Sequence, residues 1–151
     1  MRRKDKEITE PHLIETIIRR SRVCRLALSD GRNPYVVPVC FGYADGTLYI
    51  HSALEGKKIE MLRKNNRVCF EFDSVDGVVE AEKACGWSMK YQSVIGFGKA
   101  SFVDDVSSKK RAVAIIAQQY TNRLFDYPDK TIAHTTVIRI DIDSLTGKHS
   151  G

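Results

Sequence analysis

The middle of the chain, residues 35–66, carries the clearest pattern of apolar and polar positions. The run Tyr35–Tyr43 is almost wholly apolar, which predicts a strand that is covered on both faces. Turn residues at Ala44–Gly46 lead into a second strand at Thr47–His51, and a short amphipathic helix then ends near Asn66. We take these elements as the centre of the fold.

The flanking segments add further strands. Two-residue alternation or a short apolar run predicts strands at Val23–Leu28, Arg67–Asp73, Tyr91–Val103 and Val137–Asp143. Periodicity is weak at Ser74–Lys90 and Thr121–Thr135, which we predict to be irregular loops. Most strands follow one another locally, so the pattern predicts one domain, residues 1–151, built as a small, mainly antiparallel β-barrel.

A period of 3.6 residues predicts two further helices. The first places four apolar side chains on one face, namely Leu13, Ile14, Ile17 and Ile18. The second follows several N-cap candidates in Asp104–Ser108 and runs through Tyr120. We expect both helices to lie at the periphery of the barrel.

Pro38 interrupts the central apolar run. Because proline donates no ladder hydrogen bond, it belongs at a bulge or on the edge of a sheet. An unpaired edge would let a planar ligand meet the main-chain groups of Val37 and Val39, whereas a bulge would only curve the barrel. Gly96 and Gly98, at alternating positions of a later strand, likewise indicate either a bend or the close approach of something flat.

Small and basic residues gather where the central helix begins. Ser52, Gly56, Lys57 and Lys58 surround this helix start. A helix N-terminus presents unpaired N–H groups and the positive end of the backbone dipole, so two ammonium groups beside it predict a phosphate site. A solvated basic turn is the alternative, because paired lysines are common on helix surfaces.

His51 ends the second central strand, immediately before that helix start. Strand alternation places Tyr49 and His51 on one face and Leu48 and Ile50 on the other. We therefore expect His51 to point away from the main run of aliphatic side chains. Two interpretations stay open: a structural histidine that bonds a neighbouring carbonyl, or a residue of a functional site.

Composition and charge narrow the class of protein. Hydrophobic residues make up 42% of the chain, enough for a sizeable core, and no apolar run approaches the roughly 18 residues that a membrane span needs. The basic N-terminus is not followed by an apolar signal region, so we expect a soluble, cytoplasmic protein with no membrane partner.

The net charge of +5 does not by itself indicate a nucleic-acid partner. The 24 basic and 19 acidic residues are interspersed, and no basic stripe is interleaved with aromatic residues. We expect no nucleic acid and assign the charge to solubility and to the attraction of phosphorylated small molecules. A small β-barrel that binds nucleic acid is the alternative.

Four cysteines, Cys24, Cys40, Cys69 and Cys85, lie far apart in the sequence and form no C-x-x-C pair. The first three fall within apolar strand patterns, which indicates reduced, buried thiols rather than a metal site. We assign them no chemistry and predict no bound metal.

The order of these elements and several motifs resemble a known family, the FMN-binding split β-barrel proteins related to pyridoxamine 5'-phosphate oxidase. The branch that contains the nitroimidazole resistance proteins is the most similar. The resemblance covers nearly the whole chain and rests on M-R-R-K-D-K, P-Y-V-V-P-V-C-F-G-Y, D-G-T-L-Y-I-H-S-A-L-E-G-K-K, Y-Q-S-V-I-G-F-G-K-A and L-T-G-K. No single motif is diagnostic, but their order and spacing together are specific.

This resemblance implies a homodimer with FMN in a cleft between the subunits. It places the flavin ring along Val36, Val37, Pro38 and Val39, and the phosphate at Ser52, Lys57 and Lys58. Gln92 matches a position at which the oxidase carries a flavin-contacting glutamine, and His51 matches a site histidine of the nitroimidazole resistance proteins. We expect the region Trp87–Tyr91 to reach across to the partner.

The resemblance also implies an activity. We expect an FMN-dependent oxidoreductase that takes electrons from a reduced donor such as NAD(P)H and reduces a small organic acceptor, for example a nitro compound, with His51 as the catalytic residue. The chain ends in L-T-G-K-H-S-G and lacks the basic ending with which the oxidase grips pyridoxal phosphate, so we do not expect vitamin B6 oxidation. A flavin- or haem-binding protein without turnover, acting in storage, sensing or sequestration, is the alternative.

Overall fold

The computed structural model describes residues 3–151, so the first two residues of the opening motif lie outside it. Its strands are β1 (Glu7–Ile8), β2 (Cys24–Ser29), β3 (Pro34–Val39), β4 (Gly42–Ala44), β5 (Thr47–Ser52), β6 (Arg67–Val79), β7 (Ser88–Val103) and β8 (Thr136–Ser150). Its helices are α1 (Pro11–Arg20), α2 (Lys57–Lys64), α3 (Val106–Gln118) and α4 (Asp129–Ala133), with short 3-10 turns η1 (Lys4–Lys6) and η2 (Ala84–Gly86). None of the described helices is long and apolar enough to cross a membrane.

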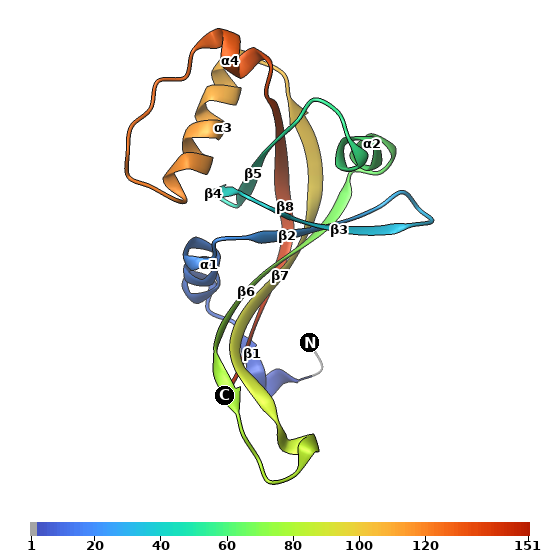
Figure 1. Ribbon diagram of the computed structural model, residues 1–151, viewed down its shortest axis with the longest axis vertical. Helices are drawn as coiled ribbons and strands as arrows, with labels where there is room; N and C mark the ends of the chain where they lie inside the picture. The colour runs from blue at the N-terminus through green and yellow to red at the C-terminus, as the bar shows by residue number, and fades with distance from the viewer. Residues whose placement is uncertain (1–2) are drawn as a thin grey trace.

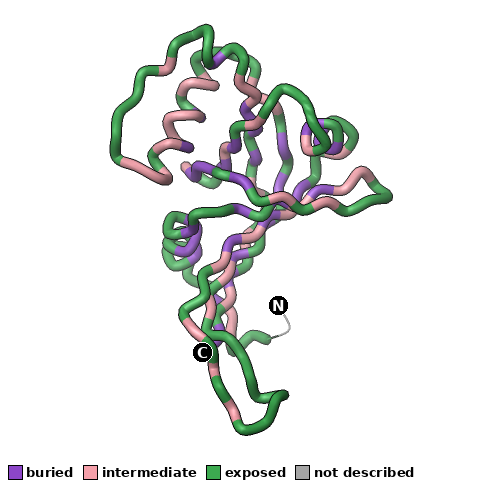
Figure 2. Tube along the Cα trace, in the orientation of Figure 1, coloured by how far each residue is buried: buried purple, intermediate pink, exposed green. Residues whose placement is uncertain are grey.

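All the strands belong to one antiparallel sheet with the order β3-β2-β6-β7-β8-β5-β4, and β1 pairs with β8. The long strands β6, β7 and β8 run the length of the molecule, while α2, α3 and α4 surround their upper half (Figure 1). Buried residues concentrate in that upper half and become sparse towards the tip of the β6–β7 hairpin (Figure 2). The predicted antiparallel, mainly β architecture with peripheral helices is confirmed.

The core is built from the inward faces of these strands. Phe70 and Phe72 of β6 are fully buried, as their alternation predicts, and the Phe72 ring lies 4.8 Å from the ring of Phe41. Gly96 of β7 lies under the Phe70 ring, because a Cβ at Gly96 would come within 2.2 Å of it. The flat group that approaches this glycine is therefore a core side chain. Gly98 stands at a β-bulge, the predicted bend.

The helices lie against this sheet at different places. Asp105 caps α3 by accepting a hydrogen bond from the Ser108 N–H at 2.8 Å, as the N-cap pattern predicts. The α3 backbone then lies directly on β4, since a Cβ at Gly42 would come within 2.6 Å of the Ile115 backbone. The prediction for α1 is right for three of its four apolar residues, but Leu13 is 44% exposed.

Two predicted loops contain regular structure. The segment Ser74–Lys90 is mostly a hairpin that extends β6 and β7 beyond the core, and α4 lies within Thr121–Thr135. The hairpin shows no clean alternation because neither of its faces packs on a core, so every residue from Glu82 to Lys90 is exposed. The prediction of an irregular loop was therefore wrong for most of Ser74–Lys90, whereas within Thr121–Thr135 only the five-residue α4 departs from the predicted loop.

The central apolar run is not one strand. Its first part forms β3, which pairs with β2, and its last part forms β4, which pairs with β5. Cys40 and Phe41 separate the two strands. Since β3 and β4 stand at opposite ends of the sheet order, the chain crosses from one edge of the sheet to the other at this point.

Candidate functional site

β3 is an edge strand, and Pro38 lies on it opposite Arg25 of β2. Of the two positions predicted for Pro38, a bulge or an edge, the structure has the edge. Val37 and Val39 face the core, but Val36 is 60% exposed and Pro38 is exposed as well. The prediction that this strand is covered on both faces is wrong for a single chain, because no described element covers its outer face.

The start of α2 offers two cations beside this edge. Gly56, with φ of 128°, makes the turn into the helix, and no side chain caps the free N–H groups of the first turn. The Lys57 ammonium lies 4.7 Å from the centre of the Tyr35 ring at the beginning of β3. Neither Lys57 nor Lys58 forms an ion pair with a residue in the described part of the chain.

Lys58 is half-buried, and the removal of water around it lowers the pKa of its ammonium group. A lowered pKa means that the charged form is destabilised at this position. An anion bound beside Lys58 would offset that cost. The structure therefore brings Lys57, Lys58 and the start of β3 together in an arrangement suited to a phosphate group.

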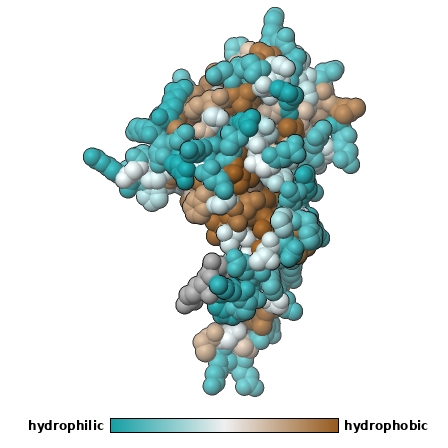
Figure 3. Space-filling model, turned by 180° about the vertical axis from the view of Figure 1, so that it is seen from behind, coloured by the Kyte–Doolittle hydropathy of each residue, from teal (hydrophilic) through white to brown (hydrophobic). Residues whose placement is uncertain are grey.

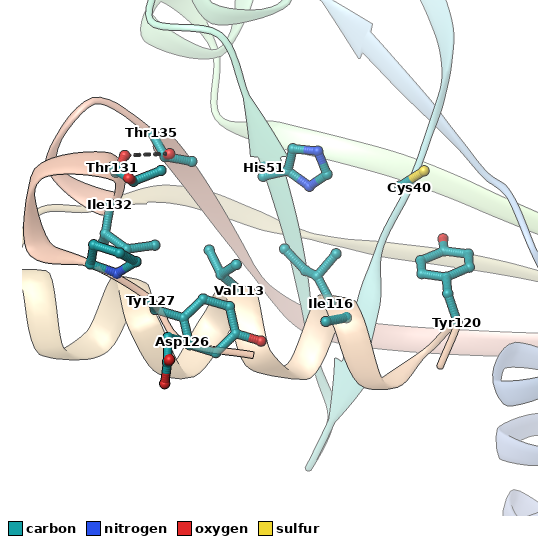
Figure 4. Close-up of a pocket in the computed structure, with 12 residues that line it drawn as sticks. Cys40, His51, Val113, Ile116, Tyr120, Asp126, Tyr127, Thr131, Ile132 and Thr135 are labelled. Atoms are coloured by element: carbon teal, nitrogen blue, oxygen red, sulfur yellow. Dashed lines mark hydrogen bonds between the residues drawn. The ribbon is translucent and has the colours of Figure 1, made fainter. Parts of the chain in front are cut away.

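His51 and Ser52 form the end of β5. Leu48 and Ile50 are fully buried, Tyr49 is half-buried and His51 is exposed, so the predicted alternation is confirmed. His51 points into a pocket of about 390 Å³ between β5 and α3 (Figure 4). That location favours the site interpretation over a histidine that bonds a neighbouring carbonyl, since no such hydrogen bond links His51 to a described residue.

Gln92 does not reach the other predicted site residues within one chain. His51 lies opposite Val137 of β8, and Gln92 lies opposite His149 of the same strand. These two positions on β8 are twelve residues apart, which corresponds to roughly 40 Å along the strand. Only a Gln92 from a second copy of the chain could join the His51 side of the site.

The pocket at His51 is lined almost wholly by apolar groups. Val113 and Ile116 rise from α3 towards His51, and Tyr127 lines the pocket from the segment between α3 and α4 (Figure 4). Cys40, between β3 and β4, lies at the same end of the pocket as the ring of Tyr120. One small aromatic molecule is a suitable occupant for a pocket of this size and character.

Tyr120 fixes that end of the pocket. Its hydroxyl accepts a hydrogen bond from the Phe41 N–H at 3.0 Å and donates one to the Arg22 carbonyl at 3.1 Å. Burial raises the pKa of this hydroxyl. The sequence analysis placed Tyr120 only among the apolar residues of a helix and did not predict it as a pocket residue. Its spacing of four residues from Ile116 was the available signal, because side chains four residues apart on a helix lie on the same face.

The cysteines differ in exposure. Cys24 is buried, and burial raises the pKa of its thiol to about 12; Cys69 is half-buried. Cys40 is exposed, so the prediction of a buried thiol was wrong there, because Cys40 lies between β3 and β4 and not within a strand. Cys85, for which no burial was predicted, is also exposed. Among residues 3–151 no disulfide and no metal-binding group of histidine, cysteine and carboxylate side chains is found.

An apolar row crosses the outer face of the sheet next to β3. Val36, Ala27, Cys69 and Phe97 lie opposite one another on β3, β2, β6 and β7. Val36 and Phe97 are 60% and 50% exposed, and the neighbouring Ile95 is 44% exposed. Apolar side chains also gather in the middle of the molecule when it is seen from behind (Figure 3). A surface of this kind is typical of a contact with another molecule.

Charged groups border this row. Arg25 of β2, which lies opposite Pro38, donates to Glu71 at 3.1 Å and also to Asp73. Burial raises the pKa of the Glu71 carboxyl, although Arg25 partly opposes that effect. An apolar centre with a polar rim is the usual anatomy of a protein interface.

A family model and several solved structures resemble this chain. The model described as pyridoxamine 5'-phosphate oxidase matches residues 10–149. A candidate 5-nitroimidazole antibiotic resistance protein from Bacteroides thetaiotaomicron VPI-5482 is 39% identical, with a TM-score of 0.84 over 94% of this chain and 85% of that chain. No curated protein matches the chain.

Two flavoproteins share the fold. A FAD-binding protein from Mesorhizobium loti is 25% identical, with a TM-score of 0.68 over 94% of this chain and 96% of that chain. A FAD- and haem-binding protein from Mycobacterium smegmatis is 22% identical, with a TM-score of 0.86 over 96% of this chain and 73% of that chain. The predicted split-barrel fold is confirmed by these likenesses.

Proposed function

Because the chain belongs to the pyridoxamine 5'-phosphate oxidase family, we propose that it binds FMN and reduces a small organic acceptor with electrons from a donor such as NAD(P)H. The observation that carries the proposal is the pair Lys57 and Lys58, which lacks carboxylate partners among the described residues and stands beside the bare edge strand β3. A phosphate and a flat ring need these two features side by side.

The protein holds and orients the flavin, which supplies the electron chemistry when it is bound. Lys57, Lys58 and the free N–H groups of the first turn of α2 neutralise and bind the phosphate, and Ser52 adds a hydroxyl donor. Val36–Val39 would hold the ring, because the open edge of β3 has main-chain groups that could bond its polar rim. The phosphate selects FMN over riboflavin.

The acceptor occupies the pocket at His51. His51 points into this apolar space and can donate a proton to an acceptor as it is reduced. The candidate nitroimidazole resistance protein, at 39% identity, supports a nitro compound as one acceptor.

A second copy of the chain completes the flavin site. We call β3 and the start of α2, where the flavin is proposed to bind, the flavin edge. The row from Val36 to Phe97 lies on the outer face of the sheet next to it, so a two-fold dimer that covers this row also covers the ring. Such a dimer brings in Gln92 and Trp87–Tyr91 from the partner. Trp87 is 53% exposed in the single chain, which suits this role.

A second candidate function has one observation in its favour. The pocket at His51 pairs an imidazole with apolar walls, and the Mycobacterium smegmatis protein of the same fold is described as binding FAD and haem. A haem-binding protein without turnover would use His51 as an iron ligand.

The absorption spectrum of the purified protein and an anaerobic titration test both functions. We expect a yellow protein, or a colourless one that takes up FMN but not riboflavin, whose flavin bleaches within seconds of adding NADH or NADPH. A haem spectrum without bound flavin would favour the second function. Apoprotein that binds FMN and riboflavin equally would exclude the phosphate site at α2.

A further inference from the structure

Tyr120 lines two depressions beside α3. One is the apolar pocket that holds His51. The other is a polar depression of about 400 Å³ between the ends of α1 and α3. Tyr120 is held between them, since its hydroxyl bonds the backbone of both Phe41 and Arg22. The two depressions therefore adjoin at a fixed point.

Three arginines line the polar depression, and no carboxylate does. Arg19 is engaged, because it lies 3.9 Å from the carboxylate of Glu15 and 5.2 Å from the centre of the Tyr43 ring. The side chains of Arg20 and Arg22 form no hydrogen bond or ion pair with another described residue. Two guanidinium groups thus face this space with their donors free.

Stabilisation of the end of α1 does not account for these arginines. Basic side chains near a helix C-terminus often bind its last carbonyl groups. Here Gln119 of the following segment takes that role, with its Nε2 2.9 Å from the Arg19 carbonyl and 3.0 Å from the Ser21 carbonyl. The carbonyl groups at the end of α1 therefore already have a hydrogen-bond donor. The guanidinium groups of Arg20 and Arg22 stay available to bind an anion.

We propose that the two depressions bind one ligand, a flat apolar molecule that carries a carboxylate, phosphate or sulfonate group. The apolar body lies against Ile116 and Tyr120 beside His51, and the anionic group binds Arg20 and Arg22. The inference rests on the proposed function for the redox role of this ligand, and it narrows the acceptor from any small organic molecule to an aromatic acid.

A pair of fluorescent probes with the same rings tests the proposal in the absence of flavin. 1-Anilinonaphthalene-8-sulfonate carries an anionic group, whereas N-phenyl-1-naphthylamine has the same ring system without it. In Arg20→Ala/Arg22→Ala we expect the sulfonate probe to bind roughly tenfold more weakly and the neutral probe to bind unchanged. Arg32→Ala/Lys64→Ala, which removes two exposed charges elsewhere, is the control and should change neither affinity.

A filled pocket separates binding here from binding at other apolar surfaces. Ala117→Phe should weaken both probes together, because Ala117 lines the pocket at His51. Should this variant fail to fold, Val113→Leu fills the same space with a smaller change. Unchanged sulfonate binding in the arginine variant, equal weakening of both probes there, or unaffected binding in the filled-pocket variant would overturn the proposal.

The same variants separate this inference from the proposed function. FMN titration of Arg20→Ala/Arg22→Ala should give the wild-type dissociation constant, since no residue of α2 or β3 lines the arginine depression. Wild-type protein that fails to bind FMN would defeat the proposed function while the contrast between the probes still holds. FMN binding with no contrast between the probes would defeat the inference alone.

Discussion

The apolar run Tyr35–Tyr43 contributes to both edge strands of the sheet, β3 and β4, but the two edges differ in how they are covered. The end that contains Gly42 is covered by α3, whose backbone leaves no room for a Cβ there. The end that contains Val36 and Pro38 has its outer face bare. Similar hydrophobicity thus has two outcomes: one half packs under α3 within the chain, and the other leaves the outer face of β3 exposed, where we propose the flavin and a second copy.

This contrast separates the two parts of the proposed site. The pocket at His51 is lined by α3 and by the segment that carries Tyr127, so all the residues of the proposed acceptor site belong to one chain. The flavin edge has cations and open backbone but lacks a cover. Changes at the flavin edge should therefore affect cofactor and assembly together, whereas changes at the pocket should leave both intact.

The largest effect is expected at the flavin edge. Lys57→Glu/Lys58→Glu places negative charge against the phosphate and removes two charge-assisted hydrogen bonds, which are worth about 1.5–3 kcal/mol each. We expect the dissociation constant for FMN to rise by roughly a hundredfold or more, as measured by titration of the apoprotein. Binding of the neutral naphthylamine probe in the pocket should not change.

Arg63→Glu/Lys64→Glu is the matched control for this prediction. It reverses two charges at the other end of the same helix, where both side chains are exposed. Glutamates at the end of a helix interact unfavourably with its dipole, so the melting temperature of this variant shows how much α2 is destabilised by charge reversal alone. Its dissociation constant for FMN should stay near the wild-type value. A wild-type dissociation constant in the folded Lys57→Glu/Lys58→Glu protein would remove these lysines from the site.

The next effect concerns His51, which lies at the border of the two parts. His51→Gln should keep FMN binding but lower the turnover number by roughly a hundredfold, the usual scale for the loss of a general acid. Steady-state rates and an FMN titration on the same preparation separate the roles. Flavin lost together with activity would make His51 a binding residue, and full activity would leave it a structural one.

A smaller effect is expected from the apolar row. Phe97→Glu puts a charge at the centre of the proposed interface, so the dimer dissociation constant should rise by roughly thirtyfold, as measured by sedimentation. FMN affinity should fall in parallel. Leu124→Glu, on a side chain that is 95% exposed, should alter neither. Wild-type protein that is monomeric at micromolar concentration with FMN tightly bound would refute the assembly.

Sequence reasoning succeeded where a segment packs on one core. β5, α2 and the buried face of β6 follow their periods closely, and the contrast between Ile50 and His51 was predictable from alternation alone. The missing N–H group of Pro38 limited it to a bulge or an edge, and the edge is what the structure shows. These predictions depend on local geometry and burial, which the pattern of residues records directly.

The failures have two physical causes: contacts between residues that lie far apart in the sequence, and a segment that packs on no core. The split of the central run depends on α3, more than sixty residues later, reaching β4. The hairpin beyond Asp73 packs on no core, so it has no apolar period to read. The pocket and the arginine depression join α1 to α3 through Tyr120, and no motif marks that contact.

The smallest predicted effect tests how the pocket side is built. Tyr120→Phe leaves the Phe41 N–H and the Arg22 carbonyl without the hydroxyl that bonds both. Since water in the adjoining pocket can replace part of these bonds, we expect a loss of about 1 kcal/mol in the free energy of unfolding, measured in urea.

Tyr127→Phe, at another wall of the same pocket, is the control. It removes a hydroxyl that has no hydrogen bond among the described residues and should change the free energy of unfolding by less than about 0.5 kcal/mol. FMN affinity should stay at the wild-type value in both variants, because neither tyrosine touches β3 or α2. Equal stability of the two variants would show that the hydroxyl of Tyr120 does not hold this side of the molecule together, and a loss of FMN in Tyr120→Phe would show that the two edges of the sheet are coupled rather than independent.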